Sequence, residues 1–236
     1  MYKAFILAAG LGTRMRPYTD HCPKPMVMVA GRSLIWRMLD RLGDVGINEV
    51  VVNLHYMADI LEVHLREYMV QNPDMVIHLS FEEGILDTGG GVKNALDYFD
   101  DDTPFYVIAG DALWEDDGVS ALKILADNWD FNKMDILTLM QPIDKMKLTR
   151  GVGDYDLLDN GLVRRSHDKS GSYMWSNIRL NSKGIYKNIK EDSFSFLRIM
   201  DDCEKKDRLY ALEYQGDWHH ISTPKDLEAV NKAFNE

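Results

Sequence analysis

Apolar segments alternate with amphipathic segments from the start of the chain to about residue 140. Ala4–Ala9 is a nearly continuous apolar run that ends before a glycine, which is typical of a strand buried on both faces. In Ala58–Tyr68 the apolar positions instead recur at helical spacing. Strands are predicted at Ala4–Ala9, Glu49–Leu54, Val76–Phe81, Pro104–Ala109 and Met134–Met140. Helices are predicted at Leu34–Leu42, Ala58–Tyr68, Gly91–Phe99 and Val119–Trp129.

The pattern changes after Gln141, where shorter and more polar segments follow one another. Turn signals such as Asp159-Asn160-Gly161 separate them, and they predict short antiparallel strands at Asp154–Leu158, Leu162–Arg164 and Tyr173–Leu180. Thr223-Pro224 then supplies an N-cap and a first helical residue for a last helix. We therefore expect one α/β domain with a Rossmann-like, mostly parallel sheet, helices on both faces and a small antiparallel insertion. Its parts are residues 1–141, 142–222 and 223–236.

Composition restricts the partners of this domain. Hydrophobic residues make up 45% of the 236 residues, enough for a substantial core, and the formal net charge is -11. An acidic chain without a long basic run does not suit nucleic acid. No apolar run is long enough to span a membrane, so we expect a cytoplasmic protein. Cys22 and Cys203 are isolated in the sequence, which argues against a zinc site or a disulfide framework.

The segment Leu7–Pro25, LAAGLGTRMRPYTDHCPKP, carries the strongest chemical signal. Gly10 and Gly12 follow the first predicted strand, and ligands bind at the carboxyl ends of strands in open α/β sheets. Glycines allow backbone N–H groups to approach anionic oxygens, and the segment also supplies the cations Arg14 and Lys24. A nicotinamide-binding fingerprint is disfavoured because Met15 stands where the third glycine would be. A triphosphate site is the better interpretation.

Two further segments lie beside predicted elements. Asp87-Thr88-Gly89-Gly90-Gly91 precedes a predicted helix, where it is either a flexible loop or a close backbone approach to a ligand. Gly110-Asp111 ends a buried strand with a carboxylate, which either caps the next turn or holds Mg²⁺ against a phosphate.

The motif LAAGLGTRMRP followed by PKPM resembles the signature of the sugar nucleotidyltransferases, and the resemblance extends over nearly the whole chain. TGGG resembles the corresponding loop of N-acetylmuramate-1-phosphate uridylyltransferases and mannose-1-phosphate guanylyltransferases. The resemblance implies that Arg14 and Lys24 contact the phosphates and that Asp111 binds the metal, which makes these three the catalytic residues. The residues implied for nucleotide binding are Ala8, Ala9, Gly10, Gly12, Thr13, Arg14, Thr88, Gly89 and Gly90.

The second half of the chain departs from this family in places. The resemblance implies that the sugar contacts Gly153, Asp154, Ser176 and Asn177, although Asn177 replaces a family glycine. His220 stands where the family has an aspartate that is the second metal ligand, and Ser222 replaces a glycine. Read alone, His220 is as well explained as a solvated imidazole at a strand end. Because Mg²⁺ prefers oxygen donors, this substitution bears directly on metal binding.

The implied reaction joins a nucleoside triphosphate to a sugar-1-phosphate and releases pyrophosphate, with Mg²⁺ as cofactor and Mn²⁺ as an alternative. UTP with N-acetylmuramate-1-phosphate, in cell-wall recycling, is the first expectation. GTP with mannose-1-phosphate or another hexose or heptose phosphate is the second. A binding module that has lost turnover is the alternative from another class, motivated by Asn177 and His220. We expect no nucleic-acid or membrane partner, and a monomer or small homo-oligomer. On this interpretation residues 1–141 bind the nucleotide and residues 142–222 bind the sugar.

Overall fold

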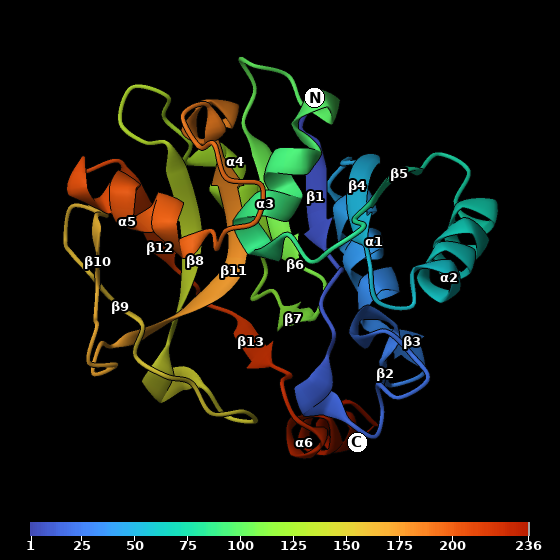
Figure 1. The fold of residues 1–236 in the computed structure, drawn as a ribbon. Helices are drawn as coiled ribbons and strands as arrows, with labels where there is room; N and C mark the ends of the chain where they lie inside the picture. The colour runs from blue at the N-terminus through green and yellow to red at the C-terminus, as the bar shows by residue number, and fades with distance from the viewer. Residues whose placement is uncertain (236) are drawn as a thin grey trace.

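The computed structural model, which describes residues 1–235, is built around a single nine-stranded sheet (Figure 1). One half of the sheet is parallel, in the order β6-β1-β4-β5. Alternate residues of β1 face opposite sides, so Phe5 packs in one hydrophobic core and Ile6 in the other. These four strands are β1 (Ala4–Leu7), β4 (Glu49–Leu54), β5 (Val76–Phe81) and β6 (Phe105–Ala109).

The other half of the sheet begins at a long strand, β11 (Tyr173–Asn181), which pairs antiparallel with both β6 and β8. β8 in turn pairs parallel with β12. The hairpin of β9 and β10 continues the sheet beyond Tyr173. The segments expected to form an antiparallel insertion are therefore part of the central sheet. The remaining strands of this half are β8 (Ile136–Pro142), β9 (Tyr155–Leu157), β10 (Val163–Arg165) and β12 (Leu209–Glu213).

Helices cover both faces of the sheet, which confirms the predicted α/β architecture. α1, α2 and α4 contribute to one hydrophobic core, and α3 and α5 contribute to the other. α6, near the end of the chain, packs on a third, smaller core with Met15 and Leu113 (Figure 1). The six helices of the described chain are α1 (Leu34–Asp44), α2 (Ala58–Gln71), α3 (Asp87–Asn94), α4 (Ala121–Asp127), α5 (Leu197–Lys205) and α6 (Pro224–Asn235).

α3 corrects one expectation, because it begins at Asp87 and not at Gly91. The three glycines of TGGG form the first turns of this helix, where the chain residues 192–194 cross closely over it. A Cβ atom on Gly89 would collide with the Phe194 ring, and one on Gly90 would collide with the Asp192 carbonyl. The glycines therefore serve close packing, and the helix ends at Asn94 before a short 3₁₀ turn at Leu96–Tyr98.

Two small two-stranded sheets flank the central one. β7 (Ala112–Glu115) pairs antiparallel with β13 (Asp217–His220), and β2 (Met28–Val29) pairs with β3 (Arg32–Ser33). β7 was not predicted from the sequence, because its four residues directly follow the turn after β6. Within residues 1–235 no helix is both long and apolar enough to cross a membrane.

Candidate active site

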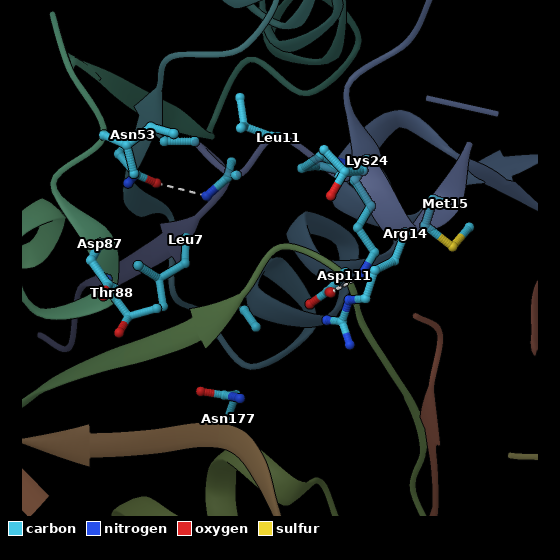
Figure 2. Close-up of a pocket in the computed structure, with 18 of the residues that line it drawn as sticks. Leu7, Leu11, Arg14, Met15, Lys24, Asn53, Asp87, Thr88, Asp111 and Asn177 are labelled. Atoms are coloured by element: carbon cyan, nitrogen blue, oxygen red, sulfur yellow. Dashed lines mark hydrogen bonds and ion pairs between the residues drawn. The ribbon is translucent and has the colours of Figure 1, made fainter. Parts of the chain in front are cut away.

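A cavity of about 670 Å³ opens where the parallel strands β1, β4 and β6 reach their carboxyl ends (Figure 2). Loops that leave these strands supply most of its wall, as expected for an open α/β sheet. Its lining residues are Leu7, Ala8, Ala9, Gly10, Leu11, Gly12, Thr13, Arg14, Met15, Lys24, Pro25, Asn53, Glu82, Ile85, Asp87, Thr88, Ala109, Asp111, Asn177, Ser193 and Ser222.

The glycine-rich loop after β1 is held in shape by Thr19. The Thr19 hydroxyl donates to the Gly12 carbonyl at 2.8 Å, and the hydroxyl of Tyr56 donates to the Thr19 carbonyl at 3.0 Å. Gly12 has a φ of 62°, a left-handed conformation that glycine adopts without steric cost. A 3₁₀ turn at Thr13–Met15 follows at once and carries Arg14 to the cavity.

Arg14, Lys24 and Asp111 gather at one end of the cavity (Figure 2). The Lys24 ammonium donates to Asp111 Oδ2, and the two side chains are only 13% and 31% exposed. Burial alone would raise the pKa of the Asp111 carboxyl, but the charge and the hydrogen bond of Lys24 outweigh it and lower that pKa. Asp111 is therefore an ionised carboxylate, and Arg14, an exposed residue, lies beside it (Figure 2). The cluster presents two cations and one anion.

His220 lies close to this cluster because of strand register. β13 pairs His220 with Ala112, the residue next to Asp111. The His220 ring stacks on Trp218 with 5.6 Å between ring centroids. Burial lowers the pKa of His220 and the charges of Lys24 and Arg14 act in the same direction, whereas Asp111 opposes them. His220 does not itself line the cavity; Ser222, two residues later, does.

The opposite end of the cavity is formed by the first turn of α3 (Figure 2). Asp87 and Thr88 line it, and the Thr88 hydroxyl oxygen accepts a hydrogen bond from the backbone N–H of Phe196 at 3.0 Å. The N–H groups of Gly89 and Gly90 both donate to the Phe194 carbonyl, at 2.9 and 3.1 Å. These two glycines are buried and do not line the cavity.

The residues expected on the sugar side are distributed differently. Asn177 lines the cavity, with a φ of 59° where the pairing of β11 with β8 shifts register. Ser176 is fully buried, and its hydroxyl donates to the Leu139 carbonyl at 2.7 Å. Gly153 packs against the backbone of Gly171, and Asp154 forms a 2.6 Å ion pair with Lys169. Of these residues the structure brings only Asn177 to the cavity.

Several lining residues were not singled out from the sequence. Asn53 and Glu82 stand at the ends of β4 and β5, so the argument that identified Asp111 at the end of β6 would also have found them. Ser193 and Ile85 carry no comparable signal in the sequence. Both line the cavity, where the Ser193 hydroxyl donates to the Ile85 carbonyl at 3.2 Å.

The donors near the cluster restrict how a metal ion would be held. Among the described residues there is no group of three or more His, Cys, Asp or Glu side chains arranged for a metal. Asp111 is the cavity's carboxylate beside the two cations, and the neighbouring His220 offers a nitrogen. One carboxylate combined with substrate phosphates is a normal environment for Mg²⁺.

Comparisons with known proteins agree with one another. The profile of a family described as nucleotidyl transferase matches residues 3–236. The chain is 33% identical over 224 residues to the N-acetylmuramate alpha-1-phosphate uridylyltransferase of Caulobacter vibrioides, covering 94% of this chain and 92% of that protein. It is 27% identical to the mannose-1-phosphate guanylyltransferase catalytic subunit beta of Danio rerio, covering 95% and 62%. The crystal structure of HddC from Yersinia pseudotuberculosis complexed with GMP-PN superposes with a TM-score of 0.78 at 27% identity, covering 99% and 100%.

Proposed function

The chain belongs to the nucleotidyl transferase family, and from that premise we propose that its cavity transfers a nucleotidyl group from a nucleoside triphosphate to a sugar-1-phosphate. The convergence of Arg14, Lys24 and Asp111 at one end of the cavity carries this proposal. A triphosphate needs close backbone donors and fixed positive charge, and the Gly10–Arg14 loop and Lys24 supply both.

In the proposed arrangement the triphosphate lies along the glycine-rich loop. Gly12 allows close backbone approach, and Arg14 pairs with phosphate oxygens. The base lies toward Asp87 and Thr88, at the other end of the cavity. The sugar phosphate enters past Asn177, which faces the cavity from the antiparallel half of the sheet. A 670 Å³ cavity is within the usual range for a site that encloses a small-molecule ligand.

The proposed reaction is an in-line displacement. An oxygen of the sugar-1-phosphate attacks the α-phosphorus, and the bond from that phosphorus to the bridging oxygen of the β-phosphate breaks. Pyrophosphate leaves with the bonding electron pair. Lys24 and Arg14 offset the negative charge that develops, so the chain contributes positioning and electrostatics without a protein nucleophile.

A divalent ion fits the residues at this end of the cavity. Asp111 is ionised and partly exposed, and it would hold the ion together with oxygens of the two substrates. The ion, when bound, adds positive charge to the phosphates. We propose Mg²⁺ because the carboxylate and phosphate oxygens are the ligands it prefers, with Mn²⁺ as an alternative that also accepts a histidine nitrogen from His220.

We propose UTP and N-acetylmuramate-1-phosphate as the substrate pair. The support is the likeness to the Caulobacter vibrioides uridylyltransferase, which covers 94% of this chain and 92% of that protein. GTP with mannose-1-phosphate or a heptose phosphate is the second candidate. It is favoured by the likeness to the Danio rerio guanylyltransferase subunit and to HddC in its GMP-PN complex.

A pyrophosphate-release panel tests both candidates. The purified chain is mixed with Mg²⁺, each of the four nucleoside triphosphates, and in turn N-acetylmuramate-, N-acetylglucosamine-, glucose-, mannose- and heptose-1-phosphate. The proposal expects the largest kcat/KM for UTP with N-acetylmuramate-1-phosphate. A maximum for GTP with mannose-1-phosphate selects the second candidate. No pyrophosphate with any pair, from a chain that still binds a triphosphate, contradicts turnover and favours a binding module.

A further inference from the structure

Asn53 and Glu82 form a buried polar pair in the wall of the cavity. Asn53 is the penultimate residue of β4, and Glu82 directly follows β5, its parallel neighbour. Asn53 is 3% exposed and Glu82 is 7% exposed. Both line the cavity, and Figure 2 shows Asn53 on the side away from Lys24 and Asp111.

Three hydrogen bonds run through this pair from one cavity loop to the other. The backbone N–H of Ala8 donates to Asn53 Oδ1 at 2.6 Å, which is the dashed line at Asn53 in Figure 2. Asn53 Nδ2 donates to Glu82 Oε1 at 2.6 Å. The backbone N–H of Leu86 donates to Glu82 Oε2 at 3.2 Å. The pair thus joins the start of the glycine-rich loop to the residue before Asp87.

The pair is closely packed against Gly91. A Cβ atom on Gly91 would lie 2.6 Å from Glu82 Oε1 and 2.8 Å from Asn53 Nδ2. Real Cβ atoms essentially never approach other atoms so closely, so glycine at position 91 makes room for the pair. α3 therefore closes over the hydrogen bonds at Gly91.

The two loops are joined through Glu82, whose carboxylate is buried. Within residues 1–235, Glu82 forms no ion pair with a lysine, arginine or histidine. A buried carboxylate that relies on neutral donors costs more than an apolar contact of the same size. The pair does, however, fix the distance and direction between two backbone segments, which an apolar contact does not.

We infer that Asn53 and Glu82 are positioning residues that hold the glycine-rich loop and the Asp87-Thr88 turn in the spacing required to bind a nucleoside triphosphate. Their polar atoms bond to protein groups, so their effect on the ligand passes through Ala8 and Leu86. This inference rests on the proposed function. It predicts that breaking the bridge weakens triphosphate binding even when the fold is intact.

Exchanging the two chemical groups provides the sharpest test. Asn53→Asp alone sets two carboxylates against each other, and Glu82→Gln alone leaves either the Asn53 amide or the Leu86 N–H without its acceptor. The double exchange Asn53→Asp with Glu82→Gln restores all three bonds, with the middle one reversed in direction. The new carboxylate accepts from Ala8 and from the new amide, whose oxygen accepts from Leu86. The net charge of the chain is unchanged.

The experiment measures the Kd of UTP and GTP by titration calorimetry without sugar phosphate, and the thermal midpoint of each variant. Each single variant is expected to raise the Kd of the better-bound triphosphate about tenfold, the change that 1.4 kcal/mol produces, and the double exchange should bring it back to within about threefold of the wild type. Asn94→Ala is the matched control. It removes a 3.3 Å hydrogen bond that the Asn94 side-chain amide on α3 donates to the Ser80 hydroxyl on β5. Both residues lie outside the cavity lining, so the Kd should be unchanged.

Four results would overturn the inference. Single variants that bind as tightly as the wild type would show that the pair only stabilises the fold, whatever their thermal midpoints. If the double exchange raises the Kd by as much as the two single variants combined, the groups contact the ligand directly. A switch of preference between UTP and GTP in Glu82→Gln alone would show the same. If the wild type binds no triphosphate, the proposed function fails, and the inference fails with it. That result differs from the first, in which the wild type binds.

Discussion

The ammonium of Lys24 and the carboxylate of Asp111, 87 residues apart in the sequence, form an ion pair at one end of the cavity. Lys24 begins the 3₁₀ turn Lys24–Met26, which follows Pro23 and contains Pro25, and Asp111 follows the strand β6. A sheet whose parallel strands end together brings the two loops face to face. The pair keeps the carboxylate ionised and holds the ammonium in place.

Lys24→Ala is expected to lower kcat by roughly 10²–10³, which is the usual cost of losing one electrostatic stabiliser at a reacting centre. The folded state should survive, because the removed side chain contributes little to the cores. The measurement is steady-state pyrophosphate release with circular dichroism of both proteins. Lys169→Ala, which breaks the 2.6 Å ion pair with Asp154 away from the cavity, is the control and should keep wild-type kcat. A Lys24→Ala variant with near-normal kcat would remove Lys24 from the mechanism.

Asp111→Asn is expected to abolish Mg²⁺-dependent turnover while leaving the fold intact. Its effect on stability depends on pH, because Lys24 lowers the pKa of Asp111 below the usual 3.8. A carboxyl with a lowered pKa stabilises the fold above its unfolded pKa, and this contribution disappears as pH falls through the folded pKa. The difference in unfolding free energy between wild type and variant should therefore be constant above about pH 5 and shrink below pH 4. Denaturant titrations across pH 3–7 measure it; a difference that persists unchanged at the lowest pH contradicts the ion pair.

The glycine-rich loop and the strand-end aspartate could be predicted because their signals are local. Gly12 and Arg14 follow the β1 strand within a few residues, and Asp111 lies two residues after the β6 strand. The sequence also indicated the alternation of strands and helices, which sets the two-faced sheet. Each of these features depends on residues that are neighbours in the chain.

The roles of the TGGG glycines could not be predicted in the same way. Gly89 and Gly90 lie in a helix because their N–H groups bond to the carbonyl of Phe194, more than 100 residues later. Asn177 likewise belongs to a sheet strand whose partners β6 and β8 come from distant parts of the chain. α5 and β12 were missed because their sequences are short and mixed in polarity. Long-range packing decided these elements, and a single sequence does not display it.

Asn177 has a left-handed backbone conformation at the cavity, which should affect the free energy of unfolding. Its φ of 59° is a conformation in which an ordinary L-residue loses roughly 1–2 kcal/mol, whereas asparagine and glycine tolerate it. Asn177→Ala should therefore lower the free energy of unfolding by about 1 kcal/mol, and Asn177→Gly should change it by less than half of that. Urea unfolding of the three proteins measures the difference. Equal stability of the alanine and glycine variants would contradict the backbone argument.

The adjacent residues His219 and His220 should make the fold sensitive to mild acid. Burial lowers the pKa of both imidazoles below 6.5. A histidine with a lowered pKa takes up its proton more readily in the unfolded chain, so the fold loses stability as pH falls below 6.5 toward the folded pKa. His219→Phe, at a 4% exposed position beside Phe234, should reduce this loss. Thermal midpoints between pH 5 and 8 provide the measurement, and parallel curves for the two proteins would refute the role of His219.

His220 is the position where metal preference should be adjustable. The pairing of β13 with β7 sets His220 opposite Ala112, the neighbour of Asp111, and its imidazole is neutral at pH 7 because burial lowers its pKa. A neutral imidazole is a weak ligand for Mg²⁺ and a better one for Mn²⁺. His220→Asp adds a second carboxylate, so Mg²⁺-dependent kcat/KM should stay the same or rise, and the Mn²⁺ to Mg²⁺ activity ratio should fall. His220→Ala removes a donor without adding one, and we expect a loss of about tenfold or less with either ion.

The measurement is kcat/KM for the three proteins over Mg²⁺ and Mn²⁺ titrations at pH 7.5, where His220 is neutral. Because His220 hydrogen-bonds Thr149 through its backbone N–H, at 2.9 Å, both substitutions leave that strand contact in place. If His220→Ala equals the wild type with both ions, the imidazole has no part in catalysis and Asp111 alone is the protein's contribution to the metal.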